Sequence, residues 1–495
     1  MHTEGVIPTV ERRNPYRVLR ERRSGVLLHP TSLPGANLGA DAFRFVDFLA
    51  DSGFTVWQML PLGPTHEDRS PYHCLSAHAI NPDLVSLERL VEWGWLRAED
   101  LPVGADRAEQ LRAARRALRQ YGPAAARAAF PAFCAAEAHW LDNYLLYAAL
   151  RAEQGGRPWW EWPAALRDRE PAALAAARTR LSDALEQVCF EQFIAQRQWQ
   201  ALRAHAAARG VLLFGDVPIF VAHDSAEVWA HRECFKLDST GHPTVVAGVP
   251  PDYFSATGQR WGNPLYDWSS MQREDFAWWV ERMHTELSRF DLIRIDHFRG
   301  FEACWEIPVD EDTAINGRWV ETPGEKLFSA LTRQLGPLPL VAEDLGLITP
   351  AVHALREFFG FPGMSILQFA FDGGADNPYL PHNQQRNCVA YTGTHDNDTT
   401  LSWFEGLPPE AQLRVVEYLG YPHEPMPWPL NRATLASVAR LAVLPMQDLL
   451  ALGRGHRMNT PGTTKGNWVW RFSWEQIPPD LSARLRRMNA LYGRV

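Results

Sequence analysis

Short apolar segments that end in polar or charged residues recur along this chain, and longer, helix-rich stretches separate them. Their apolar residues are consecutive rather than alternating, which is typical of strands buried on both faces of a parallel sheet. There are eight such segments: 25–29, 54–60, 211–216, 292–296, 340–344, 364–369, 388–391 and 441–444. This pattern predicts an α/β fold, a (β/α)₈ barrel, which places its chemistry at the carboxyl ends of its strands.

The spacing between these segments is uneven, so the barrel must carry large insertions. Residues about 85–210 are rich in Ala, Arg, Leu and Glu, which predicts a helical insertion subdomain. Residues about 220–285 are rich in Gly, Pro and aromatic side chains, which predicts an ordered, loop-rich insertion. Because no internal repeat or low-complexity linker divides the chain, we expect residues 1–495 to form a single catalytic unit.

Composition narrows the function classes. A net charge of −9 argues against a nucleic-acid or anionic-membrane surface. The 20 Trp residues favour a carbohydrate ligand, because sugar rings present apolar C–H faces that stack on flat aromatic rings. The six Cys residues form no C-x-x-C pair, which predicts reduced thiols and a cytoplasmic location. The sequence contains no apolar run of about 18 residues, so it predicts no membrane-spanning helix.

Three carboxylates lie at or just beyond the ends of predicted strands. Asp296 ends one segment, Glu343 ends the next, and Asp396 follows a third. Hydrolysis or transfer at a glycosidic bond needs one carboxylic acid to protonate the leaving oxygen. It also needs a second carboxylate, either to attack the anomeric carbon or to activate water. Taken singly, each of these residues has a second interpretation, because strand-end Asp and Glu often cap the next helix.

The neighbours of these carboxylates favour a functional interpretation. Arg294 lies two residues before Asp296, so on a strand both side chains point to the same face. An inward Arg stabilises the anionic form of a neighbouring carboxylate, although it is also compatible with a purely structural buried ion pair. His297 and His395 each adjoin a candidate carboxylate and can hydrogen-bond sugar hydroxyls.

Three motifs around these residues resemble one family. They are RIDHFRG at 294–300, AEDLG at 342–346 and TGTHDND at 392–398, and they are similar to signatures of the 4-α-glucanotransferases (amylomaltase, or disproportionating enzyme). The likeness continues over nearly the whole chain, at residues 28–35, 60–64, 70–72, 215–221, 248–268, 363–364, 457–462 and 466–468.

The resemblance implies roles for individual residues. Asp296 matches the nucleophile, Glu343 the general acid/base, and Asp396 the third carboxylate, which stabilises the distorted sugar. The segment 248–268 matches a loop that arches over the active cleft. Nine further residues match substrate-binding positions: Ser70, Tyr72, Asp216, Tyr253, Trp261, Arg294, His297, His395 and Asn467.

The activity implied is transfer of α-1,4-glucan segments to the 4-hydroxyl of an acceptor glucan or glucose, by a retaining double displacement. Glu343 must then stay protonated near neutral pH, so we expect burial and the charge of Asp296 to raise its pKa. The resemblance implies no cofactor and no metal.

Other functions fit the sequence less well. An α-glucan hydrolase would use the same carboxylates and differ only in the geometry of its acceptor site. A metal-dependent barrel hydrolase lacks recognisable ligand spacing, although several side chains are of the right type: His29, Asp216, His223, His297, Glu343 and His395. A non-catalytic glucan-binding scaffold has no need of the carboxylate trio. Dinucleotide and phosphate sites lack their glycine-rich motifs.

Overall fold

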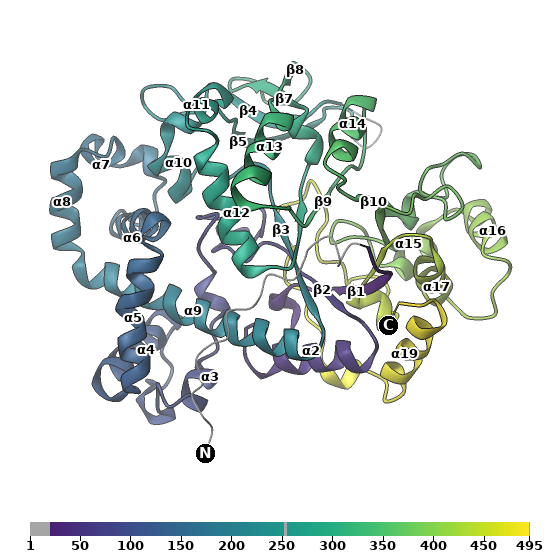
Figure 1. The fold of residues 1–495 in the computed structure, drawn as a ribbon, viewed down its shortest axis with the longest axis horizontal. Helices are drawn as coiled ribbons and strands as arrows, with labels where there is room; N and C mark the ends of the chain where they lie inside the picture. The colour runs from purple at the N-terminus through teal and green to yellow at the C-terminus, as the bar shows by residue number, and fades with distance from the viewer. Residues whose placement is uncertain (1–19, 252–254, 495) are drawn as a thin grey trace.

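The fold is a barrel of eight parallel strands, seen at the centre of the computed structural model, which describes residues 20–251 and 255–494 (Figure 1). The strands are β1 (Arg23–Leu27), β2 (Val56–Gln58), β3 (Leu212–Val217), β6 (Leu292–Ile295), β9 (Leu340–Ala342), β10 (Gly363–Ile366), β11 (Cys388–Tyr391) and β12 (Leu441–Pro445). Their order in the sheet is β10-β11-β12-β1-β2-β3-β6-β9. The Ala342 N–H donates to the Pro362 carbonyl at 2.8 Å, which joins the two ends of this order. The predicted barrel is confirmed.

Every apolar segment of the sequence overlaps one of these strands, and all residues of the eight strands except Arg23 are buried. Neighbouring strands run parallel, so their carboxyl ends lie on one rim. The polar residues that follow the strands therefore gather on that rim, as the fold predicts.

Helices fill the long connection between β2 and β3, and Figure 1 shows them projecting to one side of the barrel. They are α3 (Leu87–Glu92), α4 (Arg107–Tyr121), α5 (Ala124–Ala136), α6 (Ala138–Glu153), α7 (Ala164–Arg167), α8 (Pro171–Arg180) and α9 (Ser182–Ala208). The long helix α9 runs back to the barrel and holds the loop after β2. The amide of Gln192 bonds both backbone groups of Ile80, and the amide of Gln198 bonds both of Ser86, at 2.7–2.8 Å.

The cysteine prediction was wrong for one pair. Cys134 on α5 and Cys189 on α9 form a disulfide, whereas Cys74, Cys234, Cys304 and Cys388 are free thiols. The packing of α5 against α9 brings together two residues that lie 55 positions apart. Spacing along the sequence does not reveal such a contact between helices. The prediction of a cytoplasmic location assumed six reduced thiols, and this assumption does not hold.

A second connection, between β3 and β6, contains α10 (Ala226–Ala230), β4 (Val245–Val249), β5 (Gln259–Pro264), α11 (Trp268–Arg273) and α12 (Ala277–Arg289). Strands β4 and β5 form an antiparallel sheet with β7 (Ala303–Pro308) and β8 (Arg318–Glu321), in the order β5-β4-β7-β8. This sheet was not predictable from the sequence pattern, because β5 is mostly exposed and contains Gly and Pro. The sheet positions Trp261 beside the barrel rim.

Helices cover the remaining outer face of the barrel (Figure 1). They are α2 (Ala40–Asp51), α13 (Gly324–Leu335), α14 (Pro350–Phe358), α15 (Thr400–Gly406), α16 (Pro409–Tyr418), α17 (Trp428–Ala436), α18 (Met446–Leu449) and α19 (Leu481–Leu491). The buried guanidinium of Arg494 donates to the carbonyls of Arg23 at 2.7 Å and Leu435 at 2.6 Å. This residue ties the end of the chain to the start of β1.

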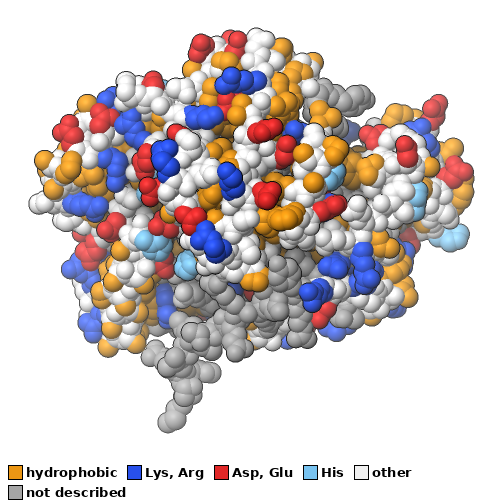
Figure 2. Space-filling view, turned by 45° about the horizontal axis from the view of Figure 1, so that its top comes forward, with side chains coloured by type: hydrophobic (Ala, Val, Ile, Leu, Met, Phe, Trp, Pro, Cys, Tyr) orange, Lys and Arg blue, Asp and Glu red, His pale blue; other side chains and the backbone are white. Residues whose placement is uncertain are grey.

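The surface in Figure 2 carries Lys and Arg side chains interspersed with Asp and Glu, rather than gathered into regions of one sign. Among the helices of residues 20–251 and 255–494, none combines the length and apolar character that crossing a bilayer requires.

Candidate active site

Asp296 and Glu343 lie side by side at the carboxyl rim of the barrel. Each directly follows a strand, and the last residues of those strands, Ile295 and Ala342, are register partners. The Glu343 N–H donates to the Ile295 carbonyl at 3.0 Å, which extends the pairing past the strand ends. The expectation that these two carboxylates share one rim therefore agrees with the geometry.

Arg294 joins two carboxylates in the barrel mouth. One of its terminal nitrogens lies 2.8 and 2.9 Å from the carboxylate oxygens of Asp216, and the other lies 2.9 Å from Asp296. Asp216 and Arg294 are buried, whereas the side chain of Asp296 is 30% exposed. The guanidinium thus holds Asp296 by one oxygen and leaves the carboxylate accessible from the cleft. The same-face prediction for Arg294 and Asp296 is confirmed.

The carboxyl group of Glu343 is held by backbone donors and by burial. The His297 N–H donates to Oε2 at 2.8 Å, and the Leu345 N–H donates to Oε1 at 3.1 Å. Burial raises the pKa of Glu343 to about 8; Arg294 opposes this shift, and the negative charge of Asp296 adds to it. Glu343 is therefore protonated at neutral pH beside a second carboxylate, which is the arrangement that acid catalysis requires.

Asp396 follows β11 and is the most exposed of the three carboxylates, with 48% of its side chain accessible. Asn459 donates from Nδ2 to its Oδ1 at 2.7 Å, and Arg457 donates to its backbone carbonyl at 2.7 Å. These contacts tie the loop after β11 to the segment near residue 460. Its carboxylate remains open to a ligand.

An aromatic wall stands between Asp216 and Asp396. The rings of Tyr72 and His395 are stacked at 5.0 Å between centroids, and Trp468 lies 6.2 Å from Tyr72 and 6.0 Å from His395. The Tyr72 hydroxyl donates to Asp216 at 2.8 Å, which fixes the ring against the barrel. Burial lowers the pKa of His395, so its imidazole is neutral and can donate or accept a hydrogen bond.

His297 lies at the barrel rim, next to Glu343. Its backbone is left-handed, with φ 49°, and burial lowers its pKa to about 4. Its Nε2 is buried and has no hydrogen-bond partner among residues 20–251 and 255–494. The ring of Trp261, 38% exposed, meets it edge-on at 4.8 Å. A buried polar nitrogen of this kind is suited to a ligand hydroxyl.

Three residues predicted to bind substrate are not observed at a substrate-binding position. Ser70 accepts a hydrogen bond from the Tyr72 N–H at 3.3 Å, and Asn467 bonds the backbone of Thr460 and Thr463 at 2.9–3.0 Å. Both side chains thus shape loops next to the site. Tyr253 lies outside the described residues.

Sequence reasoning assigned no role to two residues that the structure brings into the site, Asn459 and Trp468. Both fall within segments that carried the family resemblance, 457–462 and 466–468. That resemblance was the only signal that pointed to them, because neither follows a barrel strand.

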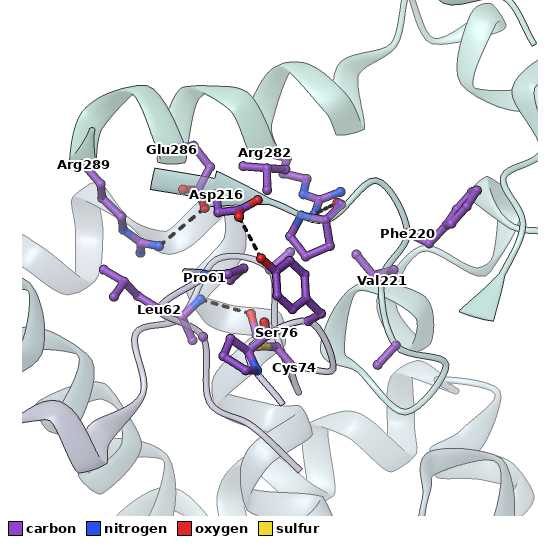
Figure 3. Close-up of a pocket in the computed structure, with 18 of the residues that line it drawn as sticks. Pro61, Leu62, Cys74, Ser76, Asp216, Phe220, Val221, Arg282, Glu286 and Arg289 are labelled. Carbon is purple, nitrogen blue, oxygen red and sulfur yellow. Dashed lines mark hydrogen bonds and ion pairs between the residues drawn. The ribbon is translucent and has the colours of Figure 1, made fainter. Parts of the chain in front are cut away.

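A small cavity of about 40 Å³ lies behind Tyr72 and Asp216. Figure 3 shows Asp216 and Glu286 on one side of it and Cys74 and Ser76 on the other. Ser76 Oγ donates to Glu227 at 2.7 Å and accepts the backbone N–H groups of His78 and Ala79. This network fixes the loop that carries Tyr72.

A metal-dependent mechanism requires several His and carboxylate side chains to converge on one ion. His223 stacks on Trp160 at 3.8 Å and bonds the Gly241 carbonyl, apart from the carboxylate pair. Within the part of the chain that the structure describes, no three His, Cys, Asp or Glu side chains are grouped as metal ligands.

Comparison with known proteins identifies a family. Residues 28–476 match the family described as 4-alpha-glucanotransferase. The chain is 50% identical to the 4-alpha-glucanotransferase of Thermus thermophilus, over 94% of this chain and 98% of the relative. It is 48% identical to the 4-alpha-glucanotransferase of Synechocystis sp., over 96% and 99%.

Solved structures agree with this result. The amylomaltase from Streptococcus agalactiae in complex with acarbose superposes with a TM-score of 0.91 at 36% identity, covering 96% of this chain and 100% of that one. The amylomaltase from Corynebacterium glutamicum shares the fold, with a TM-score of 0.74 at 20% identity, covering 97% and 75%.

Proposed function

This chain belongs to the 4-α-glucanotransferase (amylomaltase) family, and from that premise we propose that Asp296, Glu343 and Asp396 perform its glucan transfer. The observation that carries the assignment is the carboxylate pair at neighbouring strand ends. Glu343 has a raised pKa and is protonated, while the Arg294 guanidinium lies 2.9 Å from the Asp296 carboxylate. A protonated acid and an anionic nucleophile side by side are what a retaining mechanism needs.

In the first half of the reaction, an Asp296 carboxylate oxygen attacks the anomeric carbon of the donor glucan. The glycosidic bond breaks, and Glu343 transfers its proton to the leaving oxygen. The shortened glucan departs with a new hydroxyl, and the remaining segment is esterified to Asp296. Asp396, held by Asn459, and the wall of Tyr72 and His395 bind the hydroxyls and ring of the reacting sugar.

In the second half, the 4-hydroxyl of an acceptor glucan or glucose attacks the anomeric carbon. Glu343, now a carboxylate, takes the hydroxyl proton, and the bond to Asp296 breaks. Transfer rather than hydrolysis requires that the acceptor exclude water from this position. We assign that task to Trp261 and to the described residues of the segment 248–268, namely 248–251 and 255–268.

The test is incubation of the purified protein with maltotriose alone. Transfer predicts a ladder of longer maltooligosaccharides together with glucose. Hydrolysis instead yields only glucose and maltose, and that product pattern would contradict the proposed role of the cleft in excluding water. Chromatographic separation of the products over time distinguishes the two outcomes.

The raised pKa of Glu343 predicts the pH dependence of the reaction. The acid form is the active form, so kcat/KM is expected to be steady below pH 8 and to fall about tenfold per pH unit above it. The measurement is kcat/KM for maltotriose from pH 5 to 10, with thermal unfolding followed in the same buffers. A constant rate through pH 10 with the protein folded would contradict the assignment of Glu343 as the acid.

A further inference from the structure

Asp448 carries a buried carboxyl group that the proposed reaction does not use. It lies on α18, the short helix that directly follows the barrel strand β12, and it is fully buried. Burial raises the pKa of Asp448, and hydrogen bonds from Thr392 and Thr400 oppose that shift. A carboxyl group in a protein core costs free energy unless it is hydrogen-bonded, so the position of its partners indicates its role.

The partners of Asp448 are the two ends of one loop. Oδ2 accepts hydrogen bonds from the hydroxyls of Thr392 and Thr400, both at 2.6 Å, and Oδ1 accepts the Thr400 N–H at 2.8 Å. Thr392 directly follows β11, and Thr400 is the first residue of α15. The segment 392–400, which we call the Asp396 loop, contains His395 and Asp396. One carboxyl group thus fixes both the start and the end of this loop.

We propose that Asp448 is a positioning residue, which holds the Asp396 loop so that the Asp396 carboxylate meets the distorted sugar at the cleaved bond. The inference rests on the proposed function, because it needs Asp396 to act on the reacting sugar. It adds a residue of the protein core that touches no substrate and acts through Asp396.

The Asp396 loop is also braced between its two ends. Asn397 Oδ1 accepts the N–H of Thr394 at 2.9 Å and the hydroxyl of the same residue at 3.0 Å. Gln368, just after β10, donates from Nε2 to the Asp398 carbonyl at 2.9 Å. Because these bonds preserve the shape of the loop, a displacement of its ends is transmitted to the carboxylate of Asp396.

The start of α15 has a cap of its own. The Thr399 hydroxyl oxygen accepts the Ser402 N–H at 3.2 Å, and the Asp398 carboxylate accepts the Ser402 hydroxyl at 2.9 Å. Asp448 is therefore not needed as the N-cap of this helix. What Asp448 adds is a link between Thr392 and Thr400, which belong to different elements of the fold.

A second support of Asp396 also begins on α18. Gln447 donates to the His456 carbonyl at 3.1 Å. The residues that follow His456 reach Asp396, because Asn459 donates to its carboxylate and Arg457 to its backbone carbonyl, each at 2.7 Å. Two adjacent residues of α18 thus connect to both segments that place this carboxylate.

The test is a double-mutant cycle that asks whether Asp448 acts through Asp396. Thr392→Val and Thr400→Val each remove one hydroxyl that donates to Asp448 and keep the shape of the side chain. Each is made in the wild-type protein and in the Asp396→Asn variant. The substrates are α-maltosyl fluoride as donor and glucose as acceptor, and fluoride release gives kcat and KM. Fluoride is a good leaving group, which keeps slow variants measurable.

In the wild-type protein, each Val replacement is expected to lower kcat about tenfold and to change KM by less than about twofold. The physical reason is that a small displacement of a group acting in the transition state lowers the rate rather than the binding of substrate. In the Asp396→Asn variant, the same replacement should change kcat by less than about twofold, because the carboxylate to be placed is already gone.

Two controls accompany the cycle. Thr400→Ser keeps the hydroxyl that donates to Asp448, so it should retain wild-type kcat. Thr434→Val also removes a buried hydroxyl, which donates to the Leu430 carbonyl at 2.9 Å within α17 and lies outside the Asp396 loop, and it should retain wild-type kcat as well. Thermal unfolding is followed for every variant. Since Thr392 and Thr400 lie on different elements, either Val variant completes the cycle when the other does not fold.

A loss of kcat that is equal in both backgrounds would show that Asp448 only stabilises the fold, and it would overturn the positioning role. Wild-type kcat in the Val variants would overturn it too. Failure of the proposed function looks different, because Asp396→Asn alone would then keep the kcat of the wild-type protein.

Discussion

Replacing Asp296 with Asn is expected to abolish glucan transfer, with kcat for maltotriose disproportionation lowered by about 10⁴-fold or more. An amide oxygen does not form the covalent ester with the anomeric carbon, so the first half of the reaction stops. The amide also keeps the size of the carboxylate, and one oxygen remains for Arg294, which lies 2.9 Å from Asp296. The measurement is the rate of glucose release and ladder formation from maltotriose.

The control for this experiment is Asp310→Asn, an exposed residue beyond β7, which should retain wild-type activity. Thermal unfolding of the Asp296→Asn protein must also stay close to that of the wild type, because one nitrogen of Arg294 keeps its contact with both carboxylate oxygens of Asp216. A folded variant that retained more than about 1% of wild-type kcat would show that Asp296 is not the nucleophile.

The barrel was predictable because buried parallel strands leave a distinct pattern in the sequence. The segment at 211–216 is a continuous apolar run that ends in a carboxylate, and the segment at 292–296 is apolar apart from Arg294 and its final carboxylate; they correspond to β3 and β6. The same pattern placed Arg294 and Asp296 on one face, since side chains two apart on a strand point the same way. Functional residues at the ends of barrel strands can therefore be identified from the local sequence.

Contacts that depend on loops and on helix packing could not be predicted from the sequence. Asn459 reaches Asp396 across 63 residues, and Trp468 reaches Tyr72, because the segment near residue 460 folds back over the barrel mouth. A pocket lined in part by Trp261 combines residues of the helical insertion, such as Arg151 and Trp160, with the loop at His66. No periodicity connects such distant segments. The Cys134–Cys189 pair was missed for the same reason.

Replacing Glu343 with Gln is expected to separate the two chemical roles of that residue. With maltotriose, kcat should fall by about 10³-fold, because the natural leaving oxygen needs a proton and the amide has none to give. With α-maltosyl fluoride the first step should proceed at nearly the wild-type rate, because fluoride leaves without protonation. Deglycosylation then lacks its base, so a maltosyl group should accumulate on the protein.

Mass spectrometry of the intact protein detects that adduct, and the Asp296→Asn/Glu343→Gln double variant should not form it. Glu325→Gln, at an exposed position on α13, is the control for replacement of a carboxylate by an amide. The amide introduced by Glu343→Gln satisfies only one of the two backbone N–H groups that now donate to Glu343, so unfolding is expected to be easier by about 1 kcal/mol. That loss lowers activity with both donors alike. An equal fall in the rate of the first, glycosylation step with maltotriose and with the fluoride would therefore contradict acid catalysis by Glu343, whereas a fall in that step confined to maltotriose assigns the proton to this side chain.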